Sequence, residues 1–115
     1  MNEVITHIKA LQKETLLNLK SSKANNTVRA YKSDFNDFSL FCAQNGFKSL
    51  PSDPKIVSLY LTHLSTKDAK MSTLKRRLVS IGVIHKLKGH YLDMKHPSII
   101  ENIMGIKRRK GSIQI

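Results

Sequence analysis

The chain has 115 residues, enough for one domain with a modest hydrophobic core. Its 20 Lys and Arg residues outnumber its 8 Asp and Glu residues and give a formal net charge of +12. An excess of this size in a small domain favours a polyanionic partner, most often nucleic acid, over a basic surface that only meets solvent. The single cysteine, Cys42, excludes an intrachain disulfide.

The positive charge is uneven along the chain, and no targeting segment accompanies it. Residues 71–115 hold ten cations against two acids, a net of +8, whereas residues 1–70 hold ten against six, a net of +4. No apolar run reaches the length of a membrane span, and Met1 is not followed by the basic and apolar regions of a signal peptide. We therefore expect a cytoplasmic, nucleoid-associated protein with no membrane partner.

Apolar residues recur every three or four positions, which predicts helices. The first helix covers residues 3–20 and places five apolar side chains near one face: Ile5, Ile8, Leu11, Leu16 and Leu19. The second runs from about Asn26 to Asn45, where Gly46 supplies a C-cap. Its buried stripe has five members: Val28, Tyr31, Phe35, Phe38 and Cys42.

Three further helices follow. The third covers residues 54–65, with Asp53 as a good N-cap and Pro54 at the first helical position. The fourth covers residues 72–88, and the fifth covers residues 97–108. The apolar arc of the fourth helix comprises Leu74, Leu78, Ile81 and His85. No pair of alternating strand segments stands out, so the sequence predicts an all-α bundle of four or five helices.

The residues that could carry catalytic chemistry do not form a site. His85, His90 and His96 lack the spacing of metal ligands, and Cys42 reads as a small buried residue rather than a nucleophile. His85 shares the apolar arc, so we expect it in the core with a hydrogen bond. We find no phosphate-binding glycine loop and no pair of acids placed for proton transfer. The sequence therefore predicts no catalytic residue, metal or cofactor in this chain.

Within residues 71–115, cations form two clusters. Lys75, Arg76 and Arg77 occupy the first turns of the fourth helix, where the positive end of the helix dipole disfavours them. A bound polyanion would reverse that penalty. The arc that contains Arg76 also holds three short hydroxyl residues: Ser72, Thr73 and Ser80. We expect Arg76→Ala to weaken DNA binding and to leave the folding stability unchanged or slightly improved.

The second cluster lies at the C-terminal end of the predicted fifth helix, where the helix dipole stabilises cations. It comprises Lys107, Arg108, Arg109 and Lys110. Four adjacent cations leading into Gly111 are also typical of a basic linker along a phosphate backbone.

Several short motifs occur in order along the chain. They are Thr27-Val-Arg-Ala-Tyr31, Phe38-x-x-Phe41-Cys42, Leu50-Pro-Ser-Asp-Pro54, Val57-x-x-Tyr60-Leu61-x-x-Leu64, Ser72-Thr73-Leu74 and Leu78-x-x-Ile81-x-x-x-His85, followed by Gly89. In their order and spacing, over roughly residues 15–110, they resemble the N-terminal core-binding domain of tyrosine recombinases, the phage integrase family. The resemblance implies a SAM-like helical bundle that forms one half of a C-shaped clamp around DNA, with two helices crossing the major groove.

The resemblance also implies which residues meet DNA and other proteins. On the second helix the DNA-facing residues would be Thr27, Arg29, Ala30 and Ser33, and on the fourth they would be Ser72, Thr73, Arg76 and Ser80. Lys75, Arg77 and residues 107–110 complete the candidates for binding double-stranded DNA. Residues 3–20 and 97–108 would contact neighbouring recombinase protomers.

Catalysis in this family belongs to a following domain. The resemblance therefore implies a DNA-binding domain over residues 1–110 and the start of a linker at residues 111–115. Tyr31, Tyr60 and Tyr91 do not match the family's nucleophile motif. We expect a chain that binds a DNA site for integration or recombination but does not cut it, whereas the parent enzyme would rejoin DNA through a covalent phosphotyrosine.

Two other functions stay open at this point. A stand-alone helical regulator or nucleoid protein would join its two DNA-reading helices by a tight turn, whereas residues 54–65 intervene here. A basic protein-interaction bundle, whose charge serves only solubility, would fail to shift random duplex DNA in a mobility assay.

Overall fold

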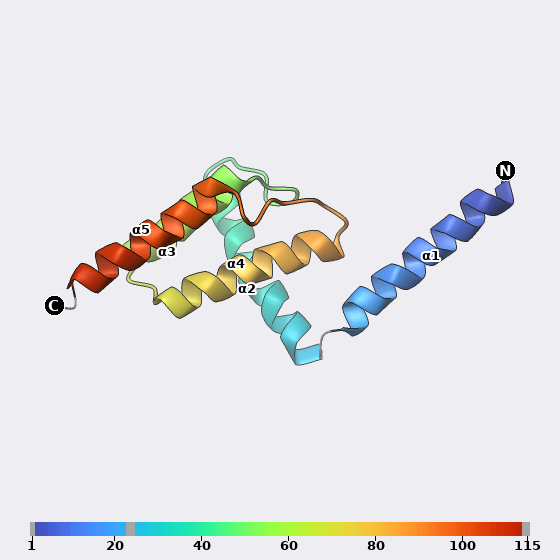
Figure 1. Ribbon diagram of the computed structural model, residues 1–115, viewed down its shortest axis with the longest axis horizontal. Coiled ribbons are helices and arrows are strands. Elements are labelled where there is room, and N and C mark those ends of the chain that lie inside the picture. The colour runs from blue at the N-terminus through green and yellow to red at the C-terminus, as the bar shows by residue number, and fades with distance from the viewer. Residues whose placement is uncertain (1, 23–24, 114–115) are drawn as a thin grey trace.

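The structure, a computed structural model, describes residues 2–22 and 25–113, and these residues form five α-helices with no strand among them. The helices are α1 (Asn2–Ser21), α2 (Asn25–Gln44), α3 (Pro54–Thr66), α4 (Met71–Leu87) and α5 (Pro97–Ile113) (Figure 1). The all-α prediction is confirmed. The ends of the first four helices lie within a residue or two of the predicted ends, whereas α5 continues past Arg108.

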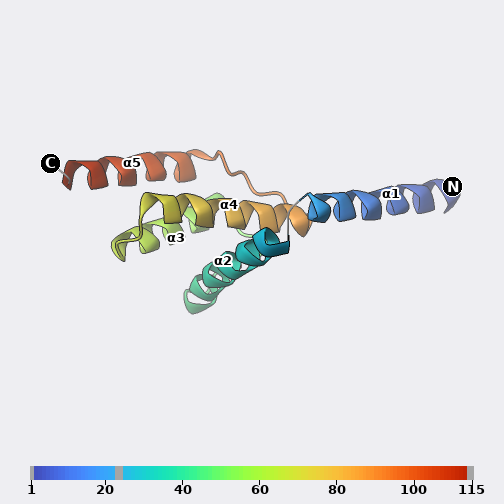
Figure 2. The same cartoon turned by 90° about the horizontal axis from the view of Figure 1, so that it is seen from below.

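Helices α2 to α5 build the bundle. Figure 2 shows α2 on one side of α3 and α4, and α5 on the other. Helix α2 packs against α4, and α5 packs against α3. The buried apolar residues come from all four helices: Phe35, Phe38, Cys42, Val57, Tyr60, Leu61, Leu74, Ile81, Ile84, Ile99 and Ile106. The apolar stripes predicted for the second and fourth helices therefore meet in one core.

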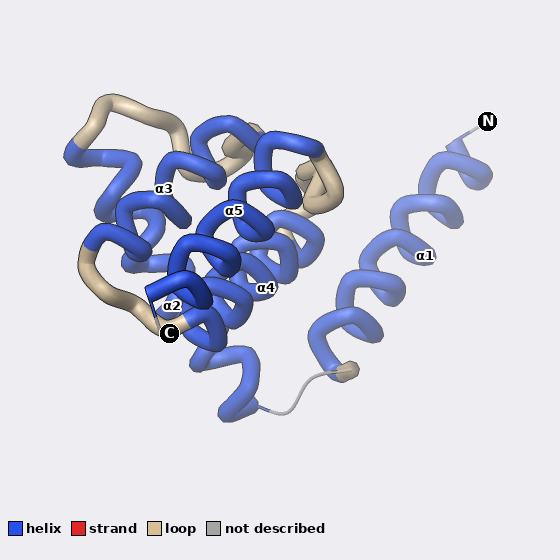
Figure 3. Tube along the Cα trace, turned by 60° about the vertical axis from the view of Figure 1, so that its left-hand side comes forward, coloured by secondary structure: helices blue, strands red, loops and turns tan. Residues whose placement is uncertain are grey.

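Helix α1 projects away from the bundle (Figures 1 and 3). The radius of gyration is 17.0 Å, compared with about 13 Å for a compact domain of this length. Four of its predicted apolar residues, Ile5, Ile8, Leu11 and Leu16, are 40–53% exposed. Leu19, near the end of the helix, lines a cleft beside α4. Most of the apolar face of α1 thus meets solvent in the described chain.

Helix ends follow the predicted capping residues. The Asp53 carboxylate accepts hydrogen bonds from two backbone N–H groups of the first turn of α3, at 2.8 and 3.1 Å. Gly46 and Gly89 have φ angles of +73° and +76°, a conformation that glycine adopts at little cost. Phe47 and His90, the residues that follow, donate to carbonyls five positions back, both at 2.8 Å. This pattern is the Schellman C-cap.

His85 lies in the core, as predicted, and is 1% exposed. Its Nδ1 lies 2.8 Å from the Ile81 carbonyl oxygen, and its Nε2 accepts from the Ser52 backbone N–H at 2.9 Å. Because a carbonyl can only accept, Nδ1 carries the proton and the ring is neutral. Burial lowers the pKa of His85 below its usual value, against the opposing effect of the Ile81 hydrogen bond.

Acid should therefore destabilise the fold through His85. The unfolded chain protonates this histidine near about pH 6.5, whereas the folded chain protonates it only at lower pH. As the pH falls below about 6.5, the free energy of unfolding should drop by up to about 1.4 kcal/mol per pH unit until the folded-state pKa is reached. Urea denaturation of the protein and of His85→Gln across this range measures the effect. An unchanged pH slope in the variant would contradict it.

Candidate nucleic-acid interface

Helices α2 and α4 meet at a buried polar contact. Ser80 is fully buried, and its Oγ donates to Oδ2 of Asp34 at 2.7 Å. Asp34 is 8% exposed and directly precedes the core residue Phe35. A carboxylate at this depth is costly unless donors and cations surround it.

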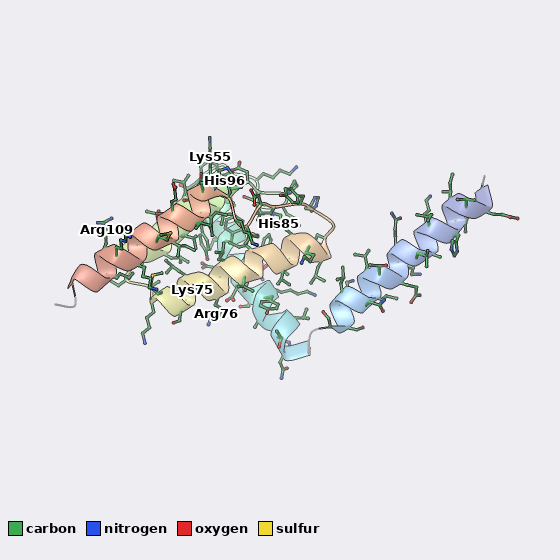
Figure 4. All side chains as sticks on the ribbon, in the orientation of Figure 1. Lys55, Lys75, Arg76, His85, His96 and Arg109 are labelled. Carbon is green, nitrogen blue, oxygen red and sulfur yellow. The ribbon has the colours of Figure 1, made fainter. Side chains whose placement is uncertain are left out.

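Arg76 supplies the first cation. Its Nε and Nη2 donate to the two carboxylate oxygens of Asp34 at 3.2 and 3.3 Å. The Arg76 side chain keeps 59% of its surface exposed, whereas the Asp34 side chain keeps 9%. Two hydrogen bonds fix the plane of the guanidinium. Arg76 is thus anchored along one edge and open to solvent elsewhere, on the lower side of α4 in Figure 4.

Arg77 lies deeper in the same contact, with 21% of its side chain exposed. Its Nε is 3.3 Å from Oδ1 of Asp34, and its Nη1 is 2.7 Å from Oδ2 of Asp37. Nη1 also donates to the hydroxyl of Tyr60 at 3.0 Å, and that hydroxyl donates to Asp37 at 2.5 Å. Arg77 therefore ties α4 to α2 and, through Tyr60, to α3.

The surroundings keep Tyr60 neutral and Arg77 charged. Burial, together with the hydrogen bond to Asp37, raises the pKa of Tyr60 well above its usual value. Burial by itself would lower the pKa of Arg77, but Tyr60 and the two carboxylates outweigh it and raise the pKa. At neutral pH, Tyr60 remains a hydroxyl donor and Arg77 a full cation.

Asp34 and Asp37 offset the repulsion at the start of α4. The helix begins after Lys70, which makes no side-chain capping bond. The sequence suggested a bound polyanion as the compensating charge, whereas the protein supplies two carboxylates of its own. The expected effect of Arg76→Ala on stability is therefore corrected. The substitution takes a partner from a buried carboxylate, so it should cost stability rather than improve it.

Most of the predicted DNA-facing residues are exposed. On α2 they are Thr27, Arg29, Ala30 and Ser33, and on α4 they are Ser72, Lys75 and Arg76, with Thr73 half-buried. The prediction that Ser80 faces DNA is wrong, because α2 covers that side of α4 and buries the hydroxyl against Asp34. Arg77 lies at the edge of the same arc, but its guanidinium is engaged by Asp34, Asp37 and Tyr60.

The second basic cluster lies elsewhere. Lys107, Arg108 and Arg109 are exposed and Lys110 is half-buried, all within α5. The helix continues through residues 111–113, where the sequence predicted a linker, since one glycine costs a helix only about 1 kcal/mol. Residues 114–115 lie outside the described residues. Arg109 lies above α5 and Arg76 below α4 in Figure 4, so these two arginines do not share one face.

A comparison with known families identifies the domain. Residues 13–88 match the phage integrase N-terminal SAM-like domain. The chain belongs to the phage integrase family. The matched span includes all of α2, α3 and α4. Asp34 lies on α2, and Arg76 and Arg77 lie on α4, so the whole contact falls within the match.

A curated relative extends the match beyond this phage integrase domain. The integrase/recombinase xerD homolog of Selenomonas ruminantium is 34% identical over 99 residues. The alignment covers 84% of this chain and 29% of the relative. The chain therefore spans less than a third of the length of the recombinase that it resembles.

The three tyrosines of this phage integrase domain differ in exposure. Tyr60 is buried, Tyr31 is half-buried, and Tyr91 is 85% exposed in the loop between α4 and α5. Burial raises the pKa of the Cys42 thiol to about 11, so the thiol is protonated at neutral pH.

Within residues 2–22 and 25–113, we find no cluster of three or more His, Cys, Asp or Glu residues that could hold a metal ion. None of the described helices combines the length and apolar character of a membrane span.

Sequence reasoning missed Asp34, Asp37 and Tyr60 as parts of the site. A local signal for the two acids exists, because Asp34 directly precedes Phe35 and Asp37 directly precedes Phe38. Acids that step along a buried stripe are rarely left without a cation. The identity of that cation depends on which helix packs against α2, and local periodicity does not contain that information.

Proposed function

We propose that this chain binds double-stranded DNA as one half of the clamp of a site-specific tyrosine recombinase, and that it does not itself cut DNA. The carrying observation is the exposed guanidinium of Arg76, anchored to α2 by Asp34 and placed beside the exposed N-terminal half of that helix. An α-helix fits the major groove, and arginine binds phosphate or guanine through paired donors. The net charge of +12 adds attraction that does not depend on sequence.

Membership of the phage integrase family supports the recombinase context. The relative from Selenomonas ruminantium is named an integrase/recombinase and is more than three times as long as the aligned segment. In our proposal, strand breakage and rejoining belong to the part of such a protein that this chain does not include. The chain contributes affinity and register on the DNA.

Removing one cation from the proposed face should change DNA binding more than removing one from elsewhere. Lys75 is exposed on α4, and Lys55 is exposed on α3, on the far side of the bundle in Figure 4. Fluorescence anisotropy with a labelled duplex at several salt concentrations should show weak binding. The logarithm of the binding constant should fall linearly with the logarithm of the salt concentration. Lys75→Ala should reduce the salt slope by about 1, and Lys55→Ala should leave it nearly unchanged.

Three results would change the proposal. Equal slopes for the two variants would mean that total charge matters and position does not. Absence of binding at low salt would refute the DNA-binding function and favour a protein-interaction bundle. Covalent adducts between this chain and duplex DNA, seen on denaturing gels, would refute the proposal that the chain does not cut DNA.

We also propose that α1 contacts a neighbouring protomer, with a smaller contribution from α5. The apolar face of α1 is exposed along Ile5, Ile8, Leu11 and Leu16, and α5 exposes Ile100 and Met104. Contiguous exposed apolar surface marks interaction sites. In the same titrations, a duplex long enough for two chains should bind the second chain more tightly than the first. Leu11→Glu should abolish this cooperativity without weakening binding to a short duplex.

A further inference from the structure

The pairing of Arg76 with Asp34 uses only part of the guanidinium. An arginine side chain has five N–H donors, and the carboxylate accepts from Nε and from Nη2. Nη1 and the second hydrogen of Nη2 therefore point away from Asp34. With 59% of the side chain exposed, this free edge presents two parallel donors to an incoming ligand.

Asp34 is itself held in place. Its side chain is 9% exposed, Ser80 donates to it at 2.7 Å, and Nε of Arg77 lies 3.3 Å away. An anchor with three partners on a second helix restricts both the position and the plane of the Arg76 guanidinium. The Arg76 side chain therefore loses most of its conformational entropy when the protein folds, and it loses less when a ligand binds.

We propose that Asp34 is a positioning residue for DNA recognition, which holds Arg76 so that its free edge meets a bidentate acceptor in the duplex. The inference rests on the proposed DNA-binding function. Two parts of DNA offer such an acceptor: O6 and N7 of guanine, and two oxygens of one phosphate. Asp34 thus strengthens binding although it places a negative charge close to a polyanion. The direction in which neutralising Asp34 changes the affinity for DNA therefore separates positioning from simple charge attraction.

Asp37 is the matched control for this sign. Both acids lie on α2, one turn apart, but the contacts of Asp37 are with Arg77 and Tyr60 rather than Arg76. If charge alone matters, Asp34→Asn and Asp37→Asn should each tighten binding, because each removes one negative charge. If Asp34 positions Arg76, Asp34→Asn should weaken binding severalfold whereas Asp37→Asn should not. Equal or tighter binding by Asp34→Asn overturns the inference.

Substitutions at Arg76 test the same geometry from the other side. Arg76→Ala should weaken binding by about tenfold or more. Arg76→Lys keeps the charge but cannot share two donors with Asp34 and two with DNA, so it should resemble Arg76→Ala. The double variant Asp34→Asn/Arg76→Ala should bind no more weakly than Arg76→Ala alone. Wild-type affinity in Arg76→Lys overturns the inference.

Thermal denaturation of every variant shows whether the fold survives. If Asp34→Asn does not fold, Ser80→Ala takes its place, because it frees Asp34 while keeping every charge, and it should weaken binding through Arg76. Unchanged binding by Ser80→Ala would then overturn the inference.

Duplexes with and without guanine separate the two acceptors. If Arg76 contacts a phosphate, Arg76→Ala should weaken binding equally on both duplexes and lower the salt slope by about 1. If the protein binds no duplex, the proposed DNA-binding function is refuted. If binding depends on Lys75 but is not weakened by Asp34→Asn, only this inference is refuted.

Discussion

Replacing Phe38 with alanine should lower the free energy of unfolding by about 3–5 kcal/mol. Phe38 is fully buried between α2 and α3, and its ring centroid lies 5.7 Å from that of Phe35 and 5.1 Å from that of Tyr60. The loss combines the transfer free energy of the ring, the cavity that it leaves and the edge-on contact with Tyr60. Urea denaturation followed by far-ultraviolet circular dichroism measures it.

Leu40 provides the control on the same helix. Its side chain is 57% exposed, so Leu40→Ala should change the free energy of unfolding by less than about 0.5 kcal/mol. A loss below about 0.5 kcal/mol for Phe38→Ala as well would show that the aromatic stripe of α2 does not form the core. Because α2 also carries Asp34, a loosened core should weaken DNA binding in parallel with the loss of stability.

Helical periodicity predicted the bundle well because it is a local property. Phe35 and Phe38 of the predicted stripe on α2 are buried, and so are Leu74 and Ile81 of the predicted arc on α4. Capping was equally local, since Asp53 and Gly46 act through hydrogen bonds within a few residues. Each of these features depends on chemistry that is complete within one helix and its ends.

Periodicity defines a face but not what covers it. The apolar face of α1 has the same spacing as those of the core helices, yet Ile8 and Leu11 remain about half exposed. Ser80 shows the converse error, because its side of α4 reads as polar but is covered by α2. The Asp34–Arg76 pair joins residues 42 positions apart. Such pairings follow from helix packing, and sequence reasoning without that packing placed Arg76 on the DNA-facing arc but assigned it no partner within the protein.

Replacing Arg77 with methionine should cost about 2–3 kcal/mol of stability. Methionine keeps a flexible apolar stem but leaves Asp37 with only the Tyr60 hydroxyl and removes one of the two cations near Asp34. Breaking a fully buried ion pair costs about 3–5 kcal/mol. The Asp37 side chain is 48% exposed, so water recovers part of that cost and the smaller value applies. Urea denaturation at neutral pH checks the loss.

Two comparisons decide whether the charge itself causes that loss. Arg76→Ala also removes a cation from Asp34, but Arg76 is 59% exposed, and this variant should lose no more than about 1 kcal/mol. Arg77→Met combined with Asp37→Asn should cost less than Arg77→Met alone, because the unpaired carboxylate is then gone. If Arg77→Met and Arg76→Ala lose the same small amount, Arg77 is one more surface cation. Apolar packing alone would then hold α4 against α2 and α3.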